Sequence, residues 1–338
     1  MTTLYIAFEE MAGEFRRVCL KTGFSPDKAK VLAGLFAENS LDGVITHGVD
    51  RFARFIEGIR QGKIVADAEP EKKGGARAME QWDGGLGPGP LNALFCTDRA
   101  IELARHYGVG AVALAHTNHW MRGGTYGWRA AKAGFLFIGW TNTIQNLPAW
   151  GAQDPRLGNN PLVLGVPHGE EAVVLDMALS QFSYGKLEAM ARAGKELPVA
   201  GGFDRSGALT REPAEILQTW RSLSIGYWKG AGLSLLLDLM VTLLSGGLST
   251  HEITAKGEEY DVSQVFIAFE LADRDSANET VAAILADLHG SKPAEPGPGS
   301  ATEAEILHPG ERALRNRRLN RERGIPVDPG VWEQIKGL

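Results

Sequence analysis

A histidine and an arginine stand four positions apart near the start of this sequence, in the segment DGVITHGVDR at 42–51. The proton of histidine moves most easily near neutral pH, and arginine offers a planar fork for a carboxylate. Apolar residues follow with helical spacing, so we expect His47 at or just before a helix N-terminus and Arg51 about one turn later. The pair could donate a proton to one small acid and clamp its carboxylate. The same residues would also suit a plain helix entry and a solvated charge.

The positive end of a helix disfavours a protonated imidazole. If His47 is an acid, a nearby carboxylate or the bound substrate must therefore offset that effect. Asp50 is a candidate for this role.

The elements that must position this segment are helices at both ends of the chain and an α/β body between them. Helices are predicted at 7–22, 26–43, 48–62, 91–107, 233–244, 311–323 and 329–336. Strands are predicted at 81–85, 110–115, 135–140, 172–176 and 264–270. A linker or exposed loop is predicted at 290–300. Because strands and helices alternate irregularly, we expect an α/β (α+β-like) fold with a mixed sheet.

Three segments organise the expected fold. Residues 1–75 form an N-terminal helical segment with His47, and residues 76–290 form a mixed α/β body that binds cofactor and substrate. Residues 301–338 form C-terminal helices that return to the N-terminal segment.

The composition is that of an ordinary globular protein. Of 338 residues, 44% are hydrophobic and 22% charged, and the net charge of −6 argues against a nucleic-acid binder. Cys19 and Cys96 lie far apart, which favours a reducing compartment. The start lacks a basic signal-peptide region, and the longest apolar stretch, 233–244, is interrupted by Asp238 and is too short to span a bilayer. We expect a cytoplasmic protein without membrane or nucleic-acid partners.

Common chemical motifs are matched poorly. The segment 108–113 fits G-x-G-x-x-A, but it follows a helix and enters a strand, whereas the dinucleotide fingerprint needs the reverse order. His116 and His119 could hold a metal, yet no third ligand cluster accompanies them, and we expect no metal. A metal-dependent hydrolase or aldolase is a distant alternative, and a non-catalytic binding protein comes after it.

A colinear series of short motifs is far more specific than any one of these templates. It comprises THGV at 46–49, RF at 51–52, EQWD at 80–83, NHWMRGG at 118–124, WTN at 140–142, GNNP at 158–161, DM at 176–177, FSYG at 182–185, GYWKG at 226–230 and PGE at 309–311. The series resembles the type 2 malate/L-lactate dehydrogenase family over nearly the whole chain. The Trp-rich motifs around Trp120 and Trp228 favour its branch of sugar-acid reductases.

The resemblance implies a nicotinamide-dependent oxidoreductase with a non-Rossmann dehydrogenase fold, acting on the CH–OH group of a 2-hydroxy acid. A reductase of a 2-oxo sugar acid is expected first, and malate, lactate, ureidoglycolate or cyclic imino acid substrates are the alternatives. The cofactor expected first is NADH, with NADPH as the alternative. Family members are dimers that bind the cofactor near the subunit interface, so we expect a homodimer.

The resemblance also assigns roles to residues. The proton donor maps onto His47, and substrate contacts map onto Thr46, Arg51, His119 and Arg122. Cofactor contacts map onto Thr141, Asn159, Val174, Asp176, Met177, Ala178, Trp228, Lys229, Gly310, Glu311 and Arg312. Two positions depart from the family pattern, Thr46 in place of serine and Asn159 in place of threonine, and both keep a polar group.

Overall fold

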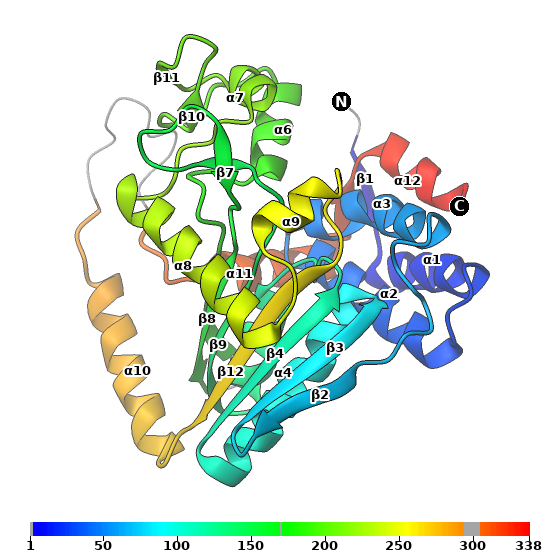
Figure 1. The fold of residues 1–338 in the computed structure, drawn as a ribbon, viewed down its shortest axis with the longest axis vertical. Helices are drawn as coiled ribbons and strands as arrows, with labels where there is room; N and C mark the ends of the chain where they lie inside the picture. Colours follow the sequence, from blue (N-terminus) through cyan, green and yellow to red (C-terminus); the bar gives the residue numbers. More distant parts are fainter. Residues whose placement is uncertain (1–2, 170, 294–304) are drawn as a thin grey trace.

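A seven-stranded mixed sheet lies at the centre of the computed structural model, which describes residues 3–169, 171–293 and 305–338 (Figure 1). The strands in order are β2 (Glu71–Ala76), β3 (Met79–Gly87), β4 (Val109–Thr117), β12 (Val262–Glu270), β5 (Phe135–Thr141), β8 (Leu162–His168) and β9 (Glu171–Met177). Strands β3 and β4 run parallel, and the other neighbours are antiparallel. The prediction of a mixed sheet is therefore confirmed.

Alternating side chains of the strands supply both faces of the sheet. In β4, Val112 and Leu114 pack with the helices α4 (Gly89–Tyr107) and α5 (Gly124–Lys132), whereas Ala113 packs with α8 (Trp228–Ser245). A strand covered on both faces reads as a continuous apolar run, which explains the pattern seen in the sequence.

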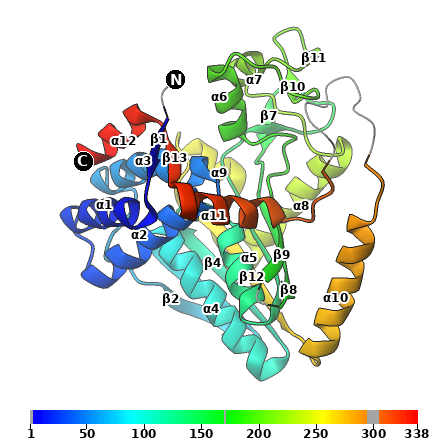
Figure 2. The ribbon, with the colours of Figure 1, turned by 180° about the vertical axis from the view of Figure 1, so that it is seen from behind.

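The two ends of the chain share one hydrophobic core (Figure 2). Three N-terminal helices, α1 (Phe8–Lys21), α2 (Pro26–Leu41) and α3 (Val49–Arg60), pack with the C-terminal helix α12 (Pro329–Lys336). The rings of Phe15, Phe36 and Phe52 meet at centroid distances of 4.2 to 6.2 Å. Beside them, β1 (Leu4–Ile6) pairs antiparallel with β13 (Ile325–Val327).

A small lobe stands at the top of Figure 1. It contains α6 (Tyr184–Arg192), β10 (Gly202–Phe203), β11 (Leu209–Thr210) and α7 (Pro213–Thr219). Leu187, Leu197 and Ile216 form its own core. The remaining elements are the 3₁₀ turn Ile45–His47, β6 (Leu147–Pro148), β7 (Pro155–Leu157), α9 (Thr250–Ala255), α10 (Arg274–His289) and α11 (Glu311–Arg323).

Most predicted elements are confirmed, and α11 and α12 match their predicted bounds. The prediction of only a short strand and turn in the Gly- and Pro-rich region was wrong, because β2 and a longer β3 form a hairpin there. Strand β2 gave no alternating pattern, since five of its six residues are exposed. Most of the linker predicted at 290–300 lies outside the described residues.

Helix α8 is longer than the apolar run at 233–244 from which a helix was predicted. It begins at Trp228, and its 18 residues have a mean hydropathy of 1.3, so by length and composition alone it could cross a membrane. This corrects the expectation that the stretch is too short. Its inner side chains, such as Leu237 and Val241, are buried against the sheet, as in the core helix of a globular protein.

Candidate active site

The loop that carries His47 is held tightly against α2. His47 ends a 3₁₀ turn, and Gly48 separates it from α3, so the predicted place just before a helix N-terminus is confirmed. An added Cβ at Gly48 would lie 2.1 Å from Oγ of Ser40. Ser40 accepts a hydrogen bond from the N–H of Val49 at 2.9 Å, and Nδ2 of Asn39 donates to the carbonyl of His47 at 3.0 Å. These buried contacts fix the backbone on both sides of the imidazole.

A second histidine stacks on the first. The rings of His47 and His119 have centroids 5.6 Å apart and planes 21° apart. The N–H of Met121 donates to Nδ1 of His119 at 2.9 Å, so a neutral His119 carries its proton on Nε2. Nδ1 of His47 lies 3.1 Å from Oγ1 of Thr46. Within the described chain neither Nε2 has a hydrogen-bond partner, which leaves both for a ligand.

Both imidazoles are neutral near pH 7. Burial, with the positive charges of Arg51 and Arg122, lowers the pKa of His47 to about 4. Burial, together with Arg51, His47 and Arg54, also lowers the pKa of His119. The site therefore repels a proton until negative charge enters it.

Arg51 is close enough to the two rings for its positive charge to lower the pKa of both imidazoles. Burial and the nearby Arg54 lower its pKa, and the carboxylates of Glu259 and Glu188 act in the opposite direction. Arginine stays charged under such conditions. Asp50, the candidate for offsetting the charge on His47, instead lies 4.0 Å from Arg192 of the small lobe. No carboxylate is among the main causes of the pKa shift of His47, so a bound substrate carboxylate would add negative charge that this site lacks.

Arg122, predicted to contact the substrate, is already engaged inside the protein. Its guanidinium is buried and forms an ion pair with the buried Asp42. The same carboxylate accepts a hydrogen bond from Nε of Arg317 at 2.5 Å. Its charge still lowers the pKa of His47, so Arg122 acts on the site through space.

The end of β9 brings a carboxylate to the same region. Asp176 accepts a hydrogen bond from the N–H of Gly124 at 2.7 Å, and burial raises its pKa. Beyond β9 the chain leads to α6, where Gly185 packs against Thr46 so closely that an added Cβ would lie 3.0 Å from the threonine methyl. Met177 and Ala178 lie on this connection, half-buried. Thr46, next to His47, thus packs against the start of α6.

Three other predicted cofactor positions are already engaged inside the protein. Thr141 donates its hydroxyl to the carbonyl of Ser263 at 2.9 Å, and Oδ1 of Asn159 accepts from Asn146 at 3.1 Å. The N–H of Val174 donates to the carbonyl of Pro309 at 3.0 Å. These hydrogen bonds hold the three residues within the protein.

The remaining predicted cofactor residues begin two helices. Trp228 and Lys229 are exposed at the start of α8, whose positive end suits a phosphate. Gly310, Glu311 and Arg312 begin α11, and Gly310 adopts φ +96°. All five lie at helix N-termini.

The two histidines considered as metal ligands, His116 and His119, contact different residues. Nδ1 of His116 lies 2.8 Å from Asp261, which also pairs with Lys256, whereas His119 stacks on His47. Among residues 3–169, 171–293 and 305–338, no three His, Cys, Asp or Glu side chains are grouped to hold a metal.

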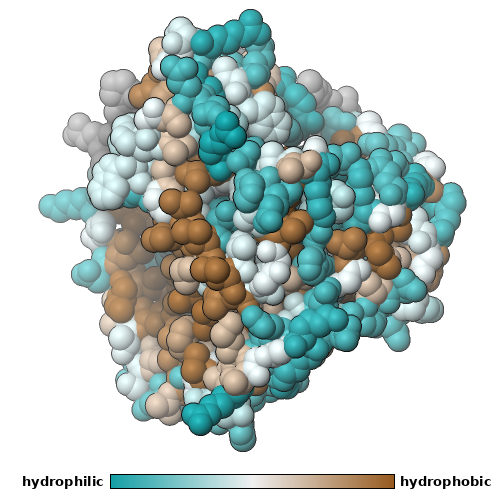
Figure 3. Space-filling view, viewed as in Figure 1, coloured by the Kyte–Doolittle hydropathy of each residue, from teal (hydrophilic) through white to brown (hydrophobic). Residues whose placement is uncertain are grey.

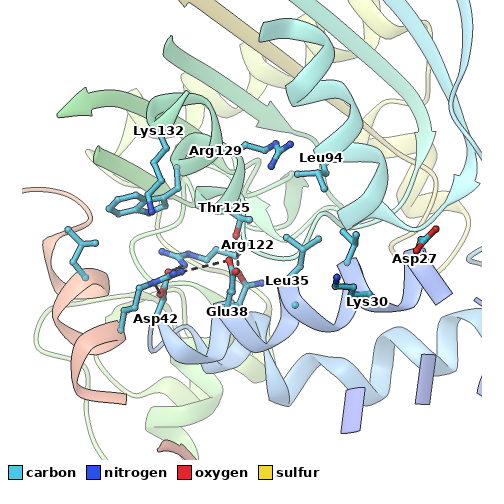
Figure 4. A pocket seen from close by; sticks show the side chains of 16 residues that line it. Asp27, Lys30, Leu35, Glu38, Asp42, Leu94, Arg122, Thr125, Arg129 and Lys132 are labelled. Carbon is cyan, nitrogen blue, oxygen red and sulfur yellow. Dashed lines mark hydrogen bonds and ion pairs between the residues drawn. The ribbon is translucent and has the colours of Figure 1, made fainter. Parts of the chain in front are cut away.

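A cavity of about 810 Å³ lies behind the loop that carries His47 (Figure 4). It runs between α2 and α5, and Leu314 and Arg317 of α11 line it as well. Asn39, Asp42 and Arg122 form part of its wall, so residues that hold the His47 loop are shared with the cavity. His47, Arg51 and Asp176 do not line it.

Sequence analysis missed the residues that position the loop. Asn39, Ser40 and Asp42 read as ordinary polar positions of α2, and their partners lie up to 275 positions away. No local spacing signals such contacts. Gly185 belongs to the quoted motif FSYG, but its contact with Thr46 could not be foreseen.

Comparisons with known proteins agree on one family. The family model described as malate/L-lactate dehydrogenase matches residues 6–336. A 2,3-diketo-L-gulonate reductase of Citrobacter koseri is 43% identical over 98% of this chain and 99% of its own, and one of Pasteurella multocida is 44% identical over the same shares. A malate dehydrogenase structure from Entamoeba histolytica superposes with a TM-score of 0.92 at 25% identity, covering 99% of this chain and 97% of that one.

Proposed function

Because this chain belongs to the malate/L-lactate dehydrogenase family, and is therefore an oxidoreductase, we propose that it reduces 2,3-diketo-L-gulonate to 3-dehydro-L-gulonate with NADH or NADPH. The observation that supports this most is the stacked pair His47 and His119 beside Arg51, with both Nε2 atoms unpartnered in the described chain.

The roles follow from charge and geometry. Arg51 binds the substrate carboxylate, and that negative charge favours the protonated form of His47. His47 donates the proton that neutralises the carbonyl oxygen as it becomes an alkoxide. His119, neutral with its proton on Nε2, donates a hydrogen bond to the substrate. General acid help of this kind contributes roughly 10²- to 10⁴-fold in rate.

The residues present fit a dinucleotide. Gly124 and Gly310 let the backbone pack closely on their neighbours, since an added Cβ would lie 3.1 Å from Asp176 at Gly124 and 3.1 Å from Trp128 at Gly310. Asp176 suits the ribose hydroxyls, and Lys229 at the start of α8 suits a phosphate. The bound cofactor supplies the hydride.

The pKa of His47 predicts an asymmetric pH dependence. Reduction needs protonated His47, whose pKa is about 4 in the free protein. Because kcat/KM reports the free enzyme, we expect log(kcat/KM) for reduction to fall by about one per pH unit from about pH 5 to 8. Oxidation of the hydroxy acid needs neutral His47 and should be level over this range. Initial rates in buffers of constant ionic strength check this. A reduction profile that is flat between pH 5 and 8 would contradict it.

The substrate is tested by offering 2,3-diketo-L-gulonate, oxaloacetate, pyruvate and a cyclic imino acid in parallel, with NADH and with NADPH. Preference for diketogulonate supports the proposal. Preference for another oxo acid keeps the roles of His47 and Arg51 and changes the substrate. No oxidation of either cofactor with any of the four would refute the proposed function.

We also propose that the protein is a cytoplasmic homodimer, and that the outer face of α8 is its interface. Five large apolar side chains of this face are 46% to 77% exposed, and Figure 3 shows them as a continuous brown band: Leu235, Leu236, Leu239, Met240 and Leu243. Asp238, the one charged residue among them, turns inward to Asn142 and the N–H of Thr250. Monomers rarely expose such a band, and its lack of charge suits an identical face. Helix α8 begins at Trp228 and Lys229, which would place the cofactor near the interface.

The cytoplasmic location is supported by the two cysteines, Cys19 and Cys96, which are unpaired, as is usual in a reducing compartment.

Light scattering after gel filtration tests the dimer. We expect twice the chain mass of 36.5 kDa, and we expect Leu236→Glu with Leu243→Glu to give the monomer mass because two charges would be buried in the interface. Val199→Glu, a change at a 51% exposed residue of the small lobe, is the control and should stay dimeric. A wild-type protein at monomer mass would exclude this interface.

A further inference from the structure

The cavity between α2 and α5 is walled by residues that hold the His47 loop. Asn39 and Asp42 lie one turn apart on α2 and line the cavity together with Arg122 and Thr125 (Figure 4). The hydroxyl of Thr125 donates to Oδ1 of Asn39 at 2.9 Å, and Arg122 forms its ion pair with Asp42. These two pairs join the walls, so a molecule that fills the cavity touches both.

The Asn39–Thr125 pair leads toward the candidate active site in two directions. Nδ2 of Asn39 donates to the carbonyl of His47 at 3.0 Å. Because a carbonyl only accepts, Oδ1 of Asn39 must face Thr125, and the threonine hydroxyl must donate. The N–H of Gly124, the residue before Thr125, donates to Asp176 at 2.7 Å. A change in the cavity can therefore reach the backbone of His47 and the end of β9.

The size and lining of the cavity suit a small organic molecule. Its volume of about 810 Å³ lies within the range of small-molecule sites, roughly 300–1,000 Å³. Nζ of Lys132 lies 5.7 Å from the centre of the Trp128 ring, and both residues line the cavity. The apolar part of the lining consists of Val31, Leu35, Leu94, Trp128 and Leu314. These side chains favour a ligand with a flat apolar body.

Gly34 keeps the middle of the α2 wall open. It lines the cavity from inside the helix, and an added Cβ would have no atom of the described chain within 4 Å outside its own turns of helix. Glycine inside a helix is less stable than alanine, and no neighbouring atom requires glycine here. A position that lowers helix stability and leaves space beside it is typical of a functional site.

The charges of the lining favour an anion. Five basic and three acidic side chains line the cavity. Asp27 lies one turn from Lys30 on α2, so these two charges offset each other. Within the described residues, Lys132 has no carboxylate partner, and the buried guanidinium of Arg122 donates only to Asp42. Because arginine has five N–H donors, Arg122 has donors left for the carboxylate of a ligand.

We propose that this cavity binds an aromatic carboxylate and that the bound anion regulates the enzyme. Trp128 packs on the aromatic body, and Arg122 and Lys132 bind the carboxylate. His47, Arg51 and Asp176 do not line the cavity, so the anion does not compete with the substrate. The regulatory effect rests on the proposed function, whereas the binding does not.

The bound anion is expected to activate reduction. A carboxylate beside Arg122 offsets part of the positive charge that opposes protonation of His47. Coupling between two sites usually changes affinity or rate at least about fivefold. We therefore expect a saturating anion to raise kcat/KM for reduction at pH 7 by about fivefold or more.

Binding of 1-naphthoate, measured by isothermal titration calorimetry, tests the site without turnover. Gly34→Leu fills the open space, so it should weaken binding roughly 10-fold or more and remove the activation. Its basal kcat should equal that of wild type, and its Tm should be no lower, because leucine favours a helix more than glycine does. Lys132→Glu, which reverses one charge of the site, should also weaken binding roughly 10-fold.

The matched control is Gly13→Leu. Gly13 lies in the middle of α1, and an added Cβ there also has no atom of the described residues within 4 Å outside its own turns of helix. This variant should bind 1-naphthoate as wild type does. If wild type does not bind the probe, or if Gly34→Leu binds it as tightly as Gly13→Leu does, the site is refuted.

The rate measurement separates regulation from the proposed function. If bound 1-naphthoate lowers kcat/KM or leaves it unchanged, the regulatory role is refuted, while reduction of an oxo acid by the free enzyme still supports the proposed function. If the probe binds wild type and not Gly34→Leu but no oxo acid is reduced, the binding site stands and the proposed function fails.

Discussion

Replacing His47 by glutamine is expected to lower kcat for reduction by about 10²- to 10⁴-fold. Glutamine can still form hydrogen bonds, but it cannot release a proton to the growing alkoxide. The neighbouring His119 is expected not to substitute, because its Nδ1 accepts a hydrogen bond from the N–H of Met121 and its Nε2 proton is expected to hold the substrate. Steady-state kinetics at saturating cofactor measures this loss.

Cofactor binding separates a chemical role from a structural one. The dissociation constant of the cofactor should be the same in His47→Gln and wild type, because the imidazole is expected to face the substrate. His106→Gln is the control, since His106 is exposed at the end of α4 and distant from the catalytic loop. A kcat for His47→Gln within tenfold of wild type would remove His47 from the mechanism.

Arg51→Gln is expected to lower kcat/KM by about 10²- to 10³-fold, mostly through KM. Truncating one partner of a desolvated charge pair costs about 2–5 kcal/mol, and each tenfold is about 1.4 kcal/mol. Arg51→Lys keeps the charge but loses the planar fork, so it should recover only part of the loss. Titration of kcat/KM against substrate for the three proteins measures the effect.

Arg51→Gln should also change the pH dependence of kcat/KM. Arg51 is one of the positive charges that lower the pKa of His47 from its ordinary value to about 4, so removing it should raise that pKa. The decline of kcat/KM with pH should then begin at a higher pH than in wild type. Arg60→Gln, at an exposed residue in the last turn of the same helix, should change neither quantity. If Arg51→Gln keeps its KM, the carboxylate clamp lies elsewhere.

The predictable parts of the fold are those whose signals are local. Helix α2 begins at Pro26, as predicted from Ser25 as N-cap and Pro26 as first helical residue. The side chain of Ser25 accepts a hydrogen bond from the N–H of Lys28. Helices α11 and α12 were found because Gly310 and Pro329 mark their starts. Helix α10 was not predicted, although Val281, Ile284, Leu285 and Leu288 have the spacing of one helix face. None of its residues is buried in the structure.

In the candidate site, too, only the features with local sequence signals could be predicted. The place of His47 at a helix entry could be derived from spacing, whereas its stacking on His119, 72 positions later, was not predicted. The family resemblance gave His119 only as a substrate contact. Arg122 was predicted to meet substrate, but its partner Asp42 comes from 80 positions earlier and left no signal. The division into segments 1–75, 76–290 and 301–338 stays a prediction.

The hydrophobic core shared by the two chain ends can be completed only after α12 has been synthesised. Phe15, Phe36 and Phe52 leave the ribosome early, but Trp332 and Ile335, which complete their packing, are made last. Until then the helices that carry the His47 loop expose an unfinished apolar surface, while the central sheet already has all its strands. We therefore expect the helices that position the His47 loop to reach their final packing only after α12 has been synthesised.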